Sequence, residues 1–264
     1  MPSAPSVRGV LLDIGGVVYV GEAPLPGAVA AVARLRAAGI KLCCLTNTTR
    51  APRRVVVERL ARMGVNIAPE AVLTPAMAAR RALHEDGRRP HFLIHPALAE
   101  DFADLAPPPD APAAVVVGDA GEGFTYAALN AAFRVLVEDD AAFLALARNR
   151  SFRDADGRLS LDAGAFVAAL EYASARPATL YGKPAPAFFA AGLAVLGCAP
   201  DEAVMIGDDV EADIAGAQAA GIAAVLVRTG KYRAGDEARI DPPPRALAAD
   251  LAAAVDWIVA RTRG

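Results

Sequence analysis

Four separate groups of polar residues in this sequence could together act on an anion. They are Asp13, the pair Thr46–Asn47, Lys183 and the pair Asp208–Asp209. A carboxylate such as Asp13 can bind a metal, accept a proton, or attack phosphorus and become an aspartyl phosphate. Thr46 and Asn47 offer neutral donors to a phosphoryl oxygen, helped by the N-terminus of a following helix. Lys183, held between a glycine and a proline, is a fixed cation that can offset the charges of an aspartate and a phosphate.

Two of these carboxylates suit a divalent cation. Mg²⁺ prefers oxygen ligands and typically binds one or two carboxylates together with phosphate oxygens and water. Asp13 and Asp208 would meet that requirement. Each group alone has an ordinary explanation, because Asp and Gly are common turn residues and a single Lys is usually solvent-exposed. The prediction of a phosphate and metal site therefore depends on the chain bringing the groups together.

The residues that precede three of these groups predict the strands that position them. Nearly continuous apolar runs at 10–12, 40–45 and 203–206 end at Asp13, at Thr46 and at Gly207–Asp208. Such runs are typical of strands buried on both faces of a parallel sheet, and ligands bind beyond the carboxyl ends of such strands. We therefore expect all three groups at one edge of one sheet. Gly15–Gly16 would let the loop after Asp13 turn tightly and approach a ligand.

The order of the predicted elements indicates an α/β fold. Helices predicted at 26–38 and 52–63 alternate with these strands, which favours a Rossmann-like parallel sheet with right-handed crossovers. The pattern restarts after residue 76, so we expect a core of residues 1–76 and 180–264 and an inserted α/β unit of residues 77–179. Further helices are expected at 77–85, up to 105, and at 126–137, 164–173, 187–196, 211–220 and 247–260, with strands at 72–75, 91–94, 114–117, 142–147 and 223–227.

Composition excludes several classes of protein. The chain has 264 residues, 55% hydrophobic and 22% charged, with a formal net charge of -3. This balance lacks the clustered basic excess of a nucleic-acid-binding protein, and no apolar stretch approaches the roughly 20 residues of a membrane span. The three cysteines Cys43, Cys44 and Cys198 show no CxxC spacing, and the N-terminus lacks the pattern of a signal peptide. We therefore expect reduced cysteines and a cytoplasmic location, with neither nucleic acid nor membrane as a partner.

Four short segments resemble the four motifs of the haloacid dehalogenase (HAD) superfamily. Residues 13–17, 45–49, 182–184 and 205–209 read DIGGV, LTNTT, GKP and MIGDD. The long gap between the second and third segments resembles the subclass with a large inserted cap, which contains the NagD-type phosphatases. Residues 118–133, 169–172 and 229–233 extend the match over nearly the whole chain. The resemblance implies a Rossmann-like HAD core with an α/β cap, an aspartyl-phosphate intermediate, Mg²⁺ as cofactor and a small phosphorylated substrate.

The resemblance also implies a role for each motif residue. Asp13 would be the nucleophile and Lys183 would orient it. The groups implied to bind phosphate are Gly15, Thr46, Asn47 and Lys183; those implied to bind the metal are Asp13, the carbonyl of Gly15, and Asp208, supported by Asp209 and Asp213. A homodimer formed through the caps is a further expectation from the family.

Gly15 departs from the superfamily pattern. Most members have a second aspartate two positions after the nucleophile, where it serves as the general acid–base, and part of this subclass lacks it. General acid–base help is typically worth about 10²–10⁴-fold. We therefore expect substrates whose leaving group needs little protonation, namely pyrophosphate or a phosphoramidate already protonated on nitrogen, with alkyl phosphates as poor substrates.

Other interpretations remain open at this point. The enzyme could act on sugar phosphates or nucleotides, or the chain could be a non-catalytic phosphate-binding protein, which the missing carboxylate at Gly15 makes conceivable. The glycines of 118–123 do not fit a dinucleotide fingerprint, but this segment could select substrate. His91 and His95 lie four residues apart in a segment predicted as a strand, so we expect them on the surface or packed and not as a metal pair. Arg50 and the cluster Arg148, Arg150 and Arg153 are outside candidates for an anionic substrate.

Overall fold

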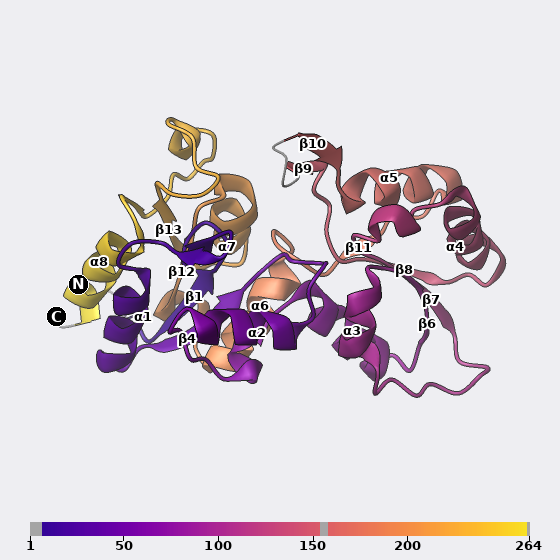
Figure 1. Cartoon of the computed structure of the whole chain (residues 1–264), viewed down its shortest axis with the longest axis horizontal. Coiled ribbons are helices and arrows are strands. Elements are labelled where there is room, and N and C mark those ends of the chain that lie inside the picture. Colours follow the sequence, from indigo (N-terminus) through magenta and orange to yellow (C-terminus); the bar gives the residue numbers. More distant parts are fainter. Residues whose placement is uncertain (1–6, 154–157, 263–264) are drawn as a thin grey trace. The chain divides into compact units, whose positions relative to one another are not determined.

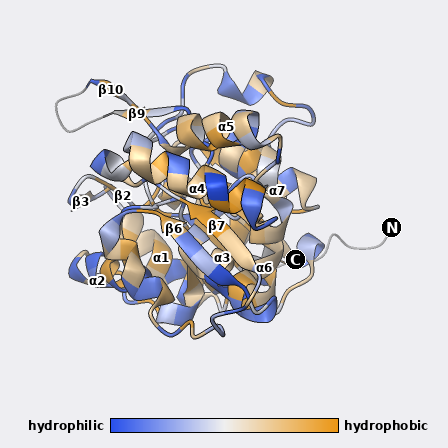
Figure 2. Ribbon diagram, turned by 90° about the vertical axis from the view of Figure 1, so that its right-hand side faces the viewer, coloured by the Kyte–Doolittle hydropathy of each residue, from blue (hydrophilic) through white to orange (hydrophobic). Residues whose placement is uncertain are grey.

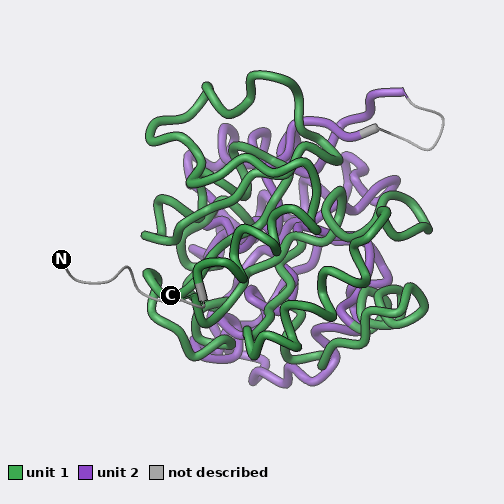
Figure 3. Tube along the Cα trace, turned by 90° about the vertical axis from the view of Figure 1, so that its left-hand side faces the viewer, with its two compact units in different colours: residues 1–46, 54–73, 183–264 green, residues 47–53, 74–182 purple. Residues whose placement is uncertain are grey.

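The computed structural model describes residues 7–153 and 158–262, which fall into two compact units. Unit 1 comprises 1–46, 54–73 and 183–264, and unit 2 comprises 47–53 and 74–182 (Figure 3). Residues 47–53 follow a strand of unit 1 but make most of their contacts with unit 2, which the sequence-based boundaries did not anticipate.

Unit 1 is built on a six-stranded sheet whose neighbours are all parallel. The strand order is β5 (Val72–Leu73), β4 (Lys41–Leu45), β1 (Gly9–Asp13), β12 (Ala203–Gly207), β13 (Ala223–Val227) and β14 (Ala246–Ala248). All five residues of the central strand β1 are buried. Because β1 lies between β4 and β12, the residues that follow these three strands emerge at one edge of the sheet. The predicted Rossmann-like α/β fold is confirmed.

Helices cover both faces of this sheet. Helices α1 (Ala28–Ala37) and α8 (Leu251–Thr262) contact each other on one face, while α6 (Pro186–Leu196) and the short α7 (Gly216–Ala219) contact each other on the opposite face (Figure 1). This division follows from right-handed crossovers, since α1 connects β1 to β4 and α6 leads to β12 on the other side of β1. Helix α2 (Arg53–Arg62) leads from β4 toward β5, and a hairpin of β2 (Tyr19–Val20) and β3 (Ala23–Pro24) follows the loop after β1.

Unit 2 is a second α/β layer structure. Its parallel sheet has the order β11 (Thr179–Leu180), β8 (Ala142–Ala145), β7 (Ala113–Val117) and β6 (Arg89–Leu93). Helices α4 (Tyr126–Glu138) and α5 (Ala163–Ser174) pack on one face, and α3 (Pro75–Glu85) with the 3-10 helix Pro96–Phe102 packs on the other. Strand β7 is apolar throughout, whereas the edge strand β6 is largely hydrophilic (Figure 2). Strands β9 (Ser151–Arg153) and β10 (Leu159–Leu161) pair in antiparallel orientation.

Several predicted elements differ from the structure. The helix expected at 247–260 is instead the strand β14 followed by α8, because pairing with the open edge of β13 outweighs the helix propensity of an alanine-rich segment. The helix expected at 211–220 begins as a π-helix, Val210–Ala215, and the helix expected up to 105 is a 3-10 helix. Leu180, expected in the core, pairs with β8 of unit 2. Among the described residues, no helix has the length and apolar character needed to cross a membrane.

Candidate active site

Three carboxylates and one ammonium group are buried together at the carboxyl edge of the unit 1 sheet. Ligand oxygens of Asp13, Asp208 and Asp213 lie within 4.8 Å of one another. Lys183 Nζ lies 2.5 Å from Asp13 Oδ1 and 2.6 Å from Asp213 Oδ1. None of the four residues is more than 7% exposed. Buried charges are costly unless they are paired, so this cluster requires its internal ion pairs.

The local sequence explains how these groups meet. Asp13 is the last residue of β1, and Asp208 is the first residue after its neighbour β12. Asp213 lies on the π-helix that follows, where its Oδ2 accepts a hydrogen bond from the backbone N–H of Asp209 at 3.1 Å. Asp209 begins this π-helix, since its Oδ1 accepts hydrogen bonds from the backbone N–H groups of Glu211 and Ala212. The GDD segment therefore places Asp208 at the cluster, and Asp209 caps the π-helix that brings Asp213 there.

A loop after β13, residues 229–231, holds Asp208 from the other side. The backbone N–H of Lys231 donates to Asp208 Oδ2 at 2.6 Å, and Thr229 Oγ1 donates to the carbonyl of Gly16 at 2.5 Å. Gly16 and Gly230 have φ of +85° and +57°, and a Cβ on either would overlap the Asp208 carboxylate. In the sequence, this segment stood out only as an extension of the family resemblance. The TG pair one residue beyond a predicted buried strand was the signal that could have indicated its role.

Burial and charge both perturb the carboxyl groups. Burial raises the pKa of Asp13, as do the neighbouring carboxylates, and Lys183 only partly offsets the rise. Burial followed by the charge of Asp213 likewise raises the pKa of Asp208. Burial alone would lower the pKa of Lys183, but Asp13 and Asp213 raise it above its ordinary value. The cluster therefore has an excess of negative charge that favours binding of a cation.

The remaining expected site residues lie in different surroundings. Gly15 is exposed, its φ is outside the left-handed region, and a Cβ built on it would meet no atom within 4 Å. Thr46 is 7% exposed, and its backbone N–H donates to the carbonyl of Leu73 at 3.2 Å. Asn47 groups with unit 2, where its Oδ1 lies close to Gly182. Of the expected set, the structure brings together Asp13, Lys183, Asp208, Asp209 and Asp213.

Two of the outside candidates, Arg50 and Arg148, form ion pairs within unit 2. The side chain of Arg153 lies outside the described part of the structure. Arg50 forms an ion pair with Asp119 of the 118–123 segment and lies over the ring of Phe152, 4.8 Å from its centroid. Arg148 forms an ion pair with Glu171. His95 Nδ1 accepts a hydrogen bond from the backbone N–H of Ala97 at 3.2 Å, where it caps the following 3-10 helix. In the described part of the chain, the grouping of potential metal ligands includes neither His91 nor His95.

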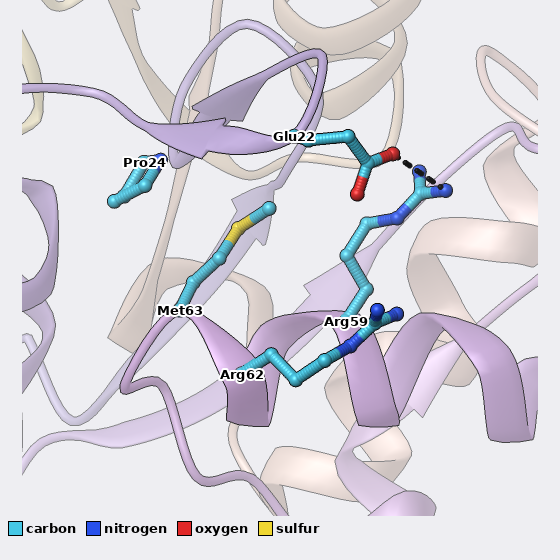
Figure 4. Close-up of a pocket in the computed structure, with 5 residues that line it drawn as sticks. All are labelled: Glu22, Pro24, Arg59, Arg62 and Met63. Carbon is cyan, nitrogen blue, oxygen red and sulfur yellow. Dashed lines mark ion pairs between the residues drawn. The ribbon is translucent and has the colours of Figure 1, made fainter.

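A pocket of about 320 Å³ lies on unit 1 between the β2–β3 hairpin and α2 (Figure 4). It is lined by Glu22, Pro24, Arg59, Arg62 and Met63, and Arg59 forms an ion pair with Glu22 at 3.3 Å. None of the expected catalytic residues lines it, so this pocket is not the buried acidic site. The ion pair of Arg59 with Glu22 instead connects α2 to the hairpin.

Comparison with known proteins decides the family. Residues 10–106 match the family model described as haloacid dehalogenase-like hydrolase, and residues 180–254 match the model described as HAD-hydrolase-like. The phospholysine phosphohistidine inorganic pyrophosphate phosphatase of Xenopus laevis is 42% identical over 97% of this chain and 96% of its own length. The chain belongs to the haloacid dehalogenase-like hydrolase family. The human haloacid dehalogenase-like hydrolase domain-containing protein 2 is 40% identical, with 98% of each chain covered.

Solved structures of HAD-type phosphatases share this fold. The p-nitrophenyl phosphatase of Archaeoglobus fulgidus superposes with a TM-score of 0.86 at 22% identity, covering 96% of this chain and 100% of the other. A glycerol phosphate phosphatase of Mycobacterium tuberculosis, solved in complex with magnesium, has a TM-score of 0.81 at 27% identity and covers 93% of this chain and 75% of the other. The predicted membership and the HAD phosphatase fold are therefore confirmed, and the protein is a phosphatase of the HAD type.

Proposed function

We propose that this protein is a Mg²⁺-dependent phosphohydrolase that works through an aspartyl phosphate on Asp13. The observation that carries the proposal is the buried ion pair of Lys183 Nζ with Asp13 Oδ1 at 2.5 Å, at the edge of a parallel sheet where ligands bind. A protein that only bound phosphate would gain nothing from placing a carboxylate there, because two anions repel. A nucleophile held by a cation explains the arrangement.

The residues of the chain have distinct parts in this proposal. A carboxylate oxygen of Asp13 forms a bond to phosphorus as the bond to the leaving group breaks, and the leaving group departs with the electron pair. Water then cleaves the acyl phosphate and releases inorganic phosphate. Lys183 orients Asp13 and favours its ionised form, and Asp213 fixes the position of Lys183. Thr46, Asn47 and the backbone of Gly15 bind the phosphoryl oxygens.

The charges of the site fit a divalent cation. Four aspartates (13, 208, 209 and 213) and two lysines (183 and 231) leave two negative charges, and every candidate ligand atom is an oxygen, as Mg²⁺ prefers. Asp13, Asp208 and the carbonyl of Gly15 would hold the metal, with Asp209 and Asp213 in support. When bound, the metal would neutralise charge on the phosphoryl oxygens and on the carboxylates together.

The preferred substrates are those whose leaving group needs no protonation. Gly15 offers no side chain for that task, and the Xenopus relative is named for phospholysine, phosphohistidine and inorganic pyrophosphate. We therefore assign pyrophosphate or a phosphoramidate as the substrate class. Sugar phosphates and nucleotides are the competing class. A cytoplasmic location and a homodimer formed through unit 2 stay predictions.

Replacing the nucleophile tests the proposed function. Asp13→Asn keeps the shape of the side chain but weakens its nucleophilic oxygen, so release of phosphate from pyrophosphate should fall at least about 10³-fold. Activity of the unaltered protein should vanish in EDTA and return with Mg²⁺. Thermal melting serves as the folding control. Full turnover by Asp13→Asn, or in chelator, would refute the aspartyl-phosphate mechanism or the metal site respectively.

A further inference from the structure

We propose that Lys231 is a second substrate-binding cation, which binds the anionic leaving group of a diphosphate. This inference depends on the proposed phosphohydrolase function and narrows its substrate class. It assigns a task to the loop of residues 229–231, whose backbone already holds Asp208.

Lys231 combines a fixed backbone with an accessible ammonium group. Its backbone N–H donates to Asp208 Oδ2 at 2.6 Å, so the residue borders the acidic cluster. Its Nζ lies 3.1 Å from Asp209 Oδ2, and its side chain is 67% exposed, against 3% for that of Lys183. One lysine is therefore sealed inside the site, and the other stands at its solvent side within the same unit.

The ammonium group of Lys231 has a carboxylate partner at this position. Asp209 Oδ2 lies 3.1 Å from Nζ and favours the charged form of the lysine. Asp209 Oδ1 also accepts hydrogen bonds from two backbone N–H groups of the following π-helix, so the carboxylate of Asp209 is only partly engaged by Lys231. The ammonium group of Lys231 is thus tethered to Asp209 and still able to bind an incoming anion.

The inner lysine cannot serve the leaving group. Lys183 Nζ already binds Asp13 and Asp213, and Gly15 contributes no side chain to this region. In pyrophosphate hydrolysis the bond from Asp13 to phosphorus forms, the bridging P–O bond breaks, and the bridging oxygen leaves with its electron pair on inorganic phosphate. Lys231 stabilises that added negative charge. A phosphoramidate protonated on nitrogen releases a neutral amine, which gains nothing from a cation.

The kinetic test compares these two substrates. In the presence of Mg²⁺, Lys231→Met should lower kcat/KM for pyrophosphate about tenfold to a hundredfold, which is the range for loss of a charge-assisted hydrogen bond. The fold-loss in kcat/KM for phosphoramidate should be at least about ten times smaller than that for pyrophosphate. Lys231→Arg keeps the positive charge and should retain most of the preference for pyrophosphate over phosphoramidate. The matched control is Arg239→Met, which removes an exposed cation of the same unit that is paired with Asp236 and Glu211. Equal losses on both substrates would overturn the inference.

A binding measurement separates this inference from the proposed function. Calorimetry with Mg²⁺ in the Asp13→Asn background should show that Lys231→Met weakens pyrophosphate binding at least about tenfold and weakens binding of inorganic phosphate much less. Because it requires no turnover, this result stands even if the wild-type protein hydrolyses neither compound. Absence of wild-type hydrolysis would refute the proposed function alone. Unchanged affinity for pyrophosphate would refute the role of Lys231.

Discussion

At the scale of single residues, Gly15 and Gly16 show that neighbouring glycines can be present for different reasons. Gly16 has φ of +85°, and any Cβ there would overlap Asp208, so the fold requires glycine. Gly15 has neither constraint, because its φ is ordinary and its Cβ direction is open. The fold therefore does not require the absence of a side chain at Gly15, and we interpret that absence as a matter of substrate class.

Gly15→Asp tests this interpretation. The structure leaves room for the carboxyl group, so the free energy of unfolding should change by less than about 1 kcal/mol, as for most surface substitutions. Turnover of an alkyl phosphate should rise at least about tenfold, because a general acid becomes available, whereas pyrophosphate should gain much less. Parallel assays of both substrates with thermal melts measure these effects. A stable variant with unchanged preference would show that Gly15 does not set the substrate class.

At the scale of elements, the site depends on the loops that follow β1 and β13. Thr229 bonds the carbonyl of Gly16, and Lys231 bonds Asp208, so these loops fix each other and the carboxylate between them. Gly230 makes the close approach possible. Of the residues expected to bind the metal, these two loops contain Gly15, which would act through its backbone carbonyl and not through a side chain.

Gly230→Ala should disturb the metal site through this contact. The left-handed backbone alone costs about 1–2 kcal/mol for alanine, and overlap with Asp208 adds about 1–3 kcal/mol. We also expect Mg²⁺ affinity to fall at least about tenfold. Gly235→Ala is the matched control, since Gly235 has φ of +93° but a Cβ there meets nothing within 4 Å. Melting and Mg²⁺ titration of both variants measure the difference, and equal effects would contradict this role for Gly230.

At the scale of the whole molecule, the acidic cluster links folding, pH and metal. The folded state raises the pKa of Asp13 to about 7 and that of Asp208 to about 6, by burial and by mutual repulsion. The unfolded chain has ordinary aspartate pKa values near 3.9. Between about pH 4 and pH 7 the folded state therefore binds more protons than the unfolded state, so the stability of the metal-free protein decreases as pH rises through this range.

The melting temperature of the metal-free protein should therefore be lower at pH 8 than at pH 5. Each unit of pKa difference corresponds to about 1.4 kcal/mol. Saturating Mg²⁺ should stabilise the protein more at pH 8 than at pH 5, because the metal binds the deprotonated carboxylates. Melts in EDTA and in Mg²⁺ at both pH values measure this, with Asp208→Asn expected to reduce the pH dependence. A metal-free protein that is more stable at pH 8 would contradict this account of the cluster.

The central strands and the residues at their ends follow from local sequence patterns. Apolar runs before Asp13 and Asp208 predict strands buried on both faces, and the order of elements then requires a parallel sheet, because burial and crossover handedness are local consequences of the pattern. The family resemblance and the roles it implies also came from short motifs. Elements governed by weaker local signals were wrong, as β14 shows, since its alanine-rich segment pairs only because a sheet edge is available.

The contacts between side chains of the site depend on how distant elements pack. Asp213 was expected to support the metal, but its ion pair with Lys183 joins residues 30 positions apart, and no local pattern predicts it. The bond from Lys231 to Asp208 depends on the register of β12 against β13 and on a glycine at Gly230. Sequence patterns report which face of an element is buried, whereas distances between side chains depend on how separate elements pack. That is why the acidic residues and Lys183 could be named from the sequence, while Lys231 and the loops that position Asp208 could be assigned only in the folded molecule.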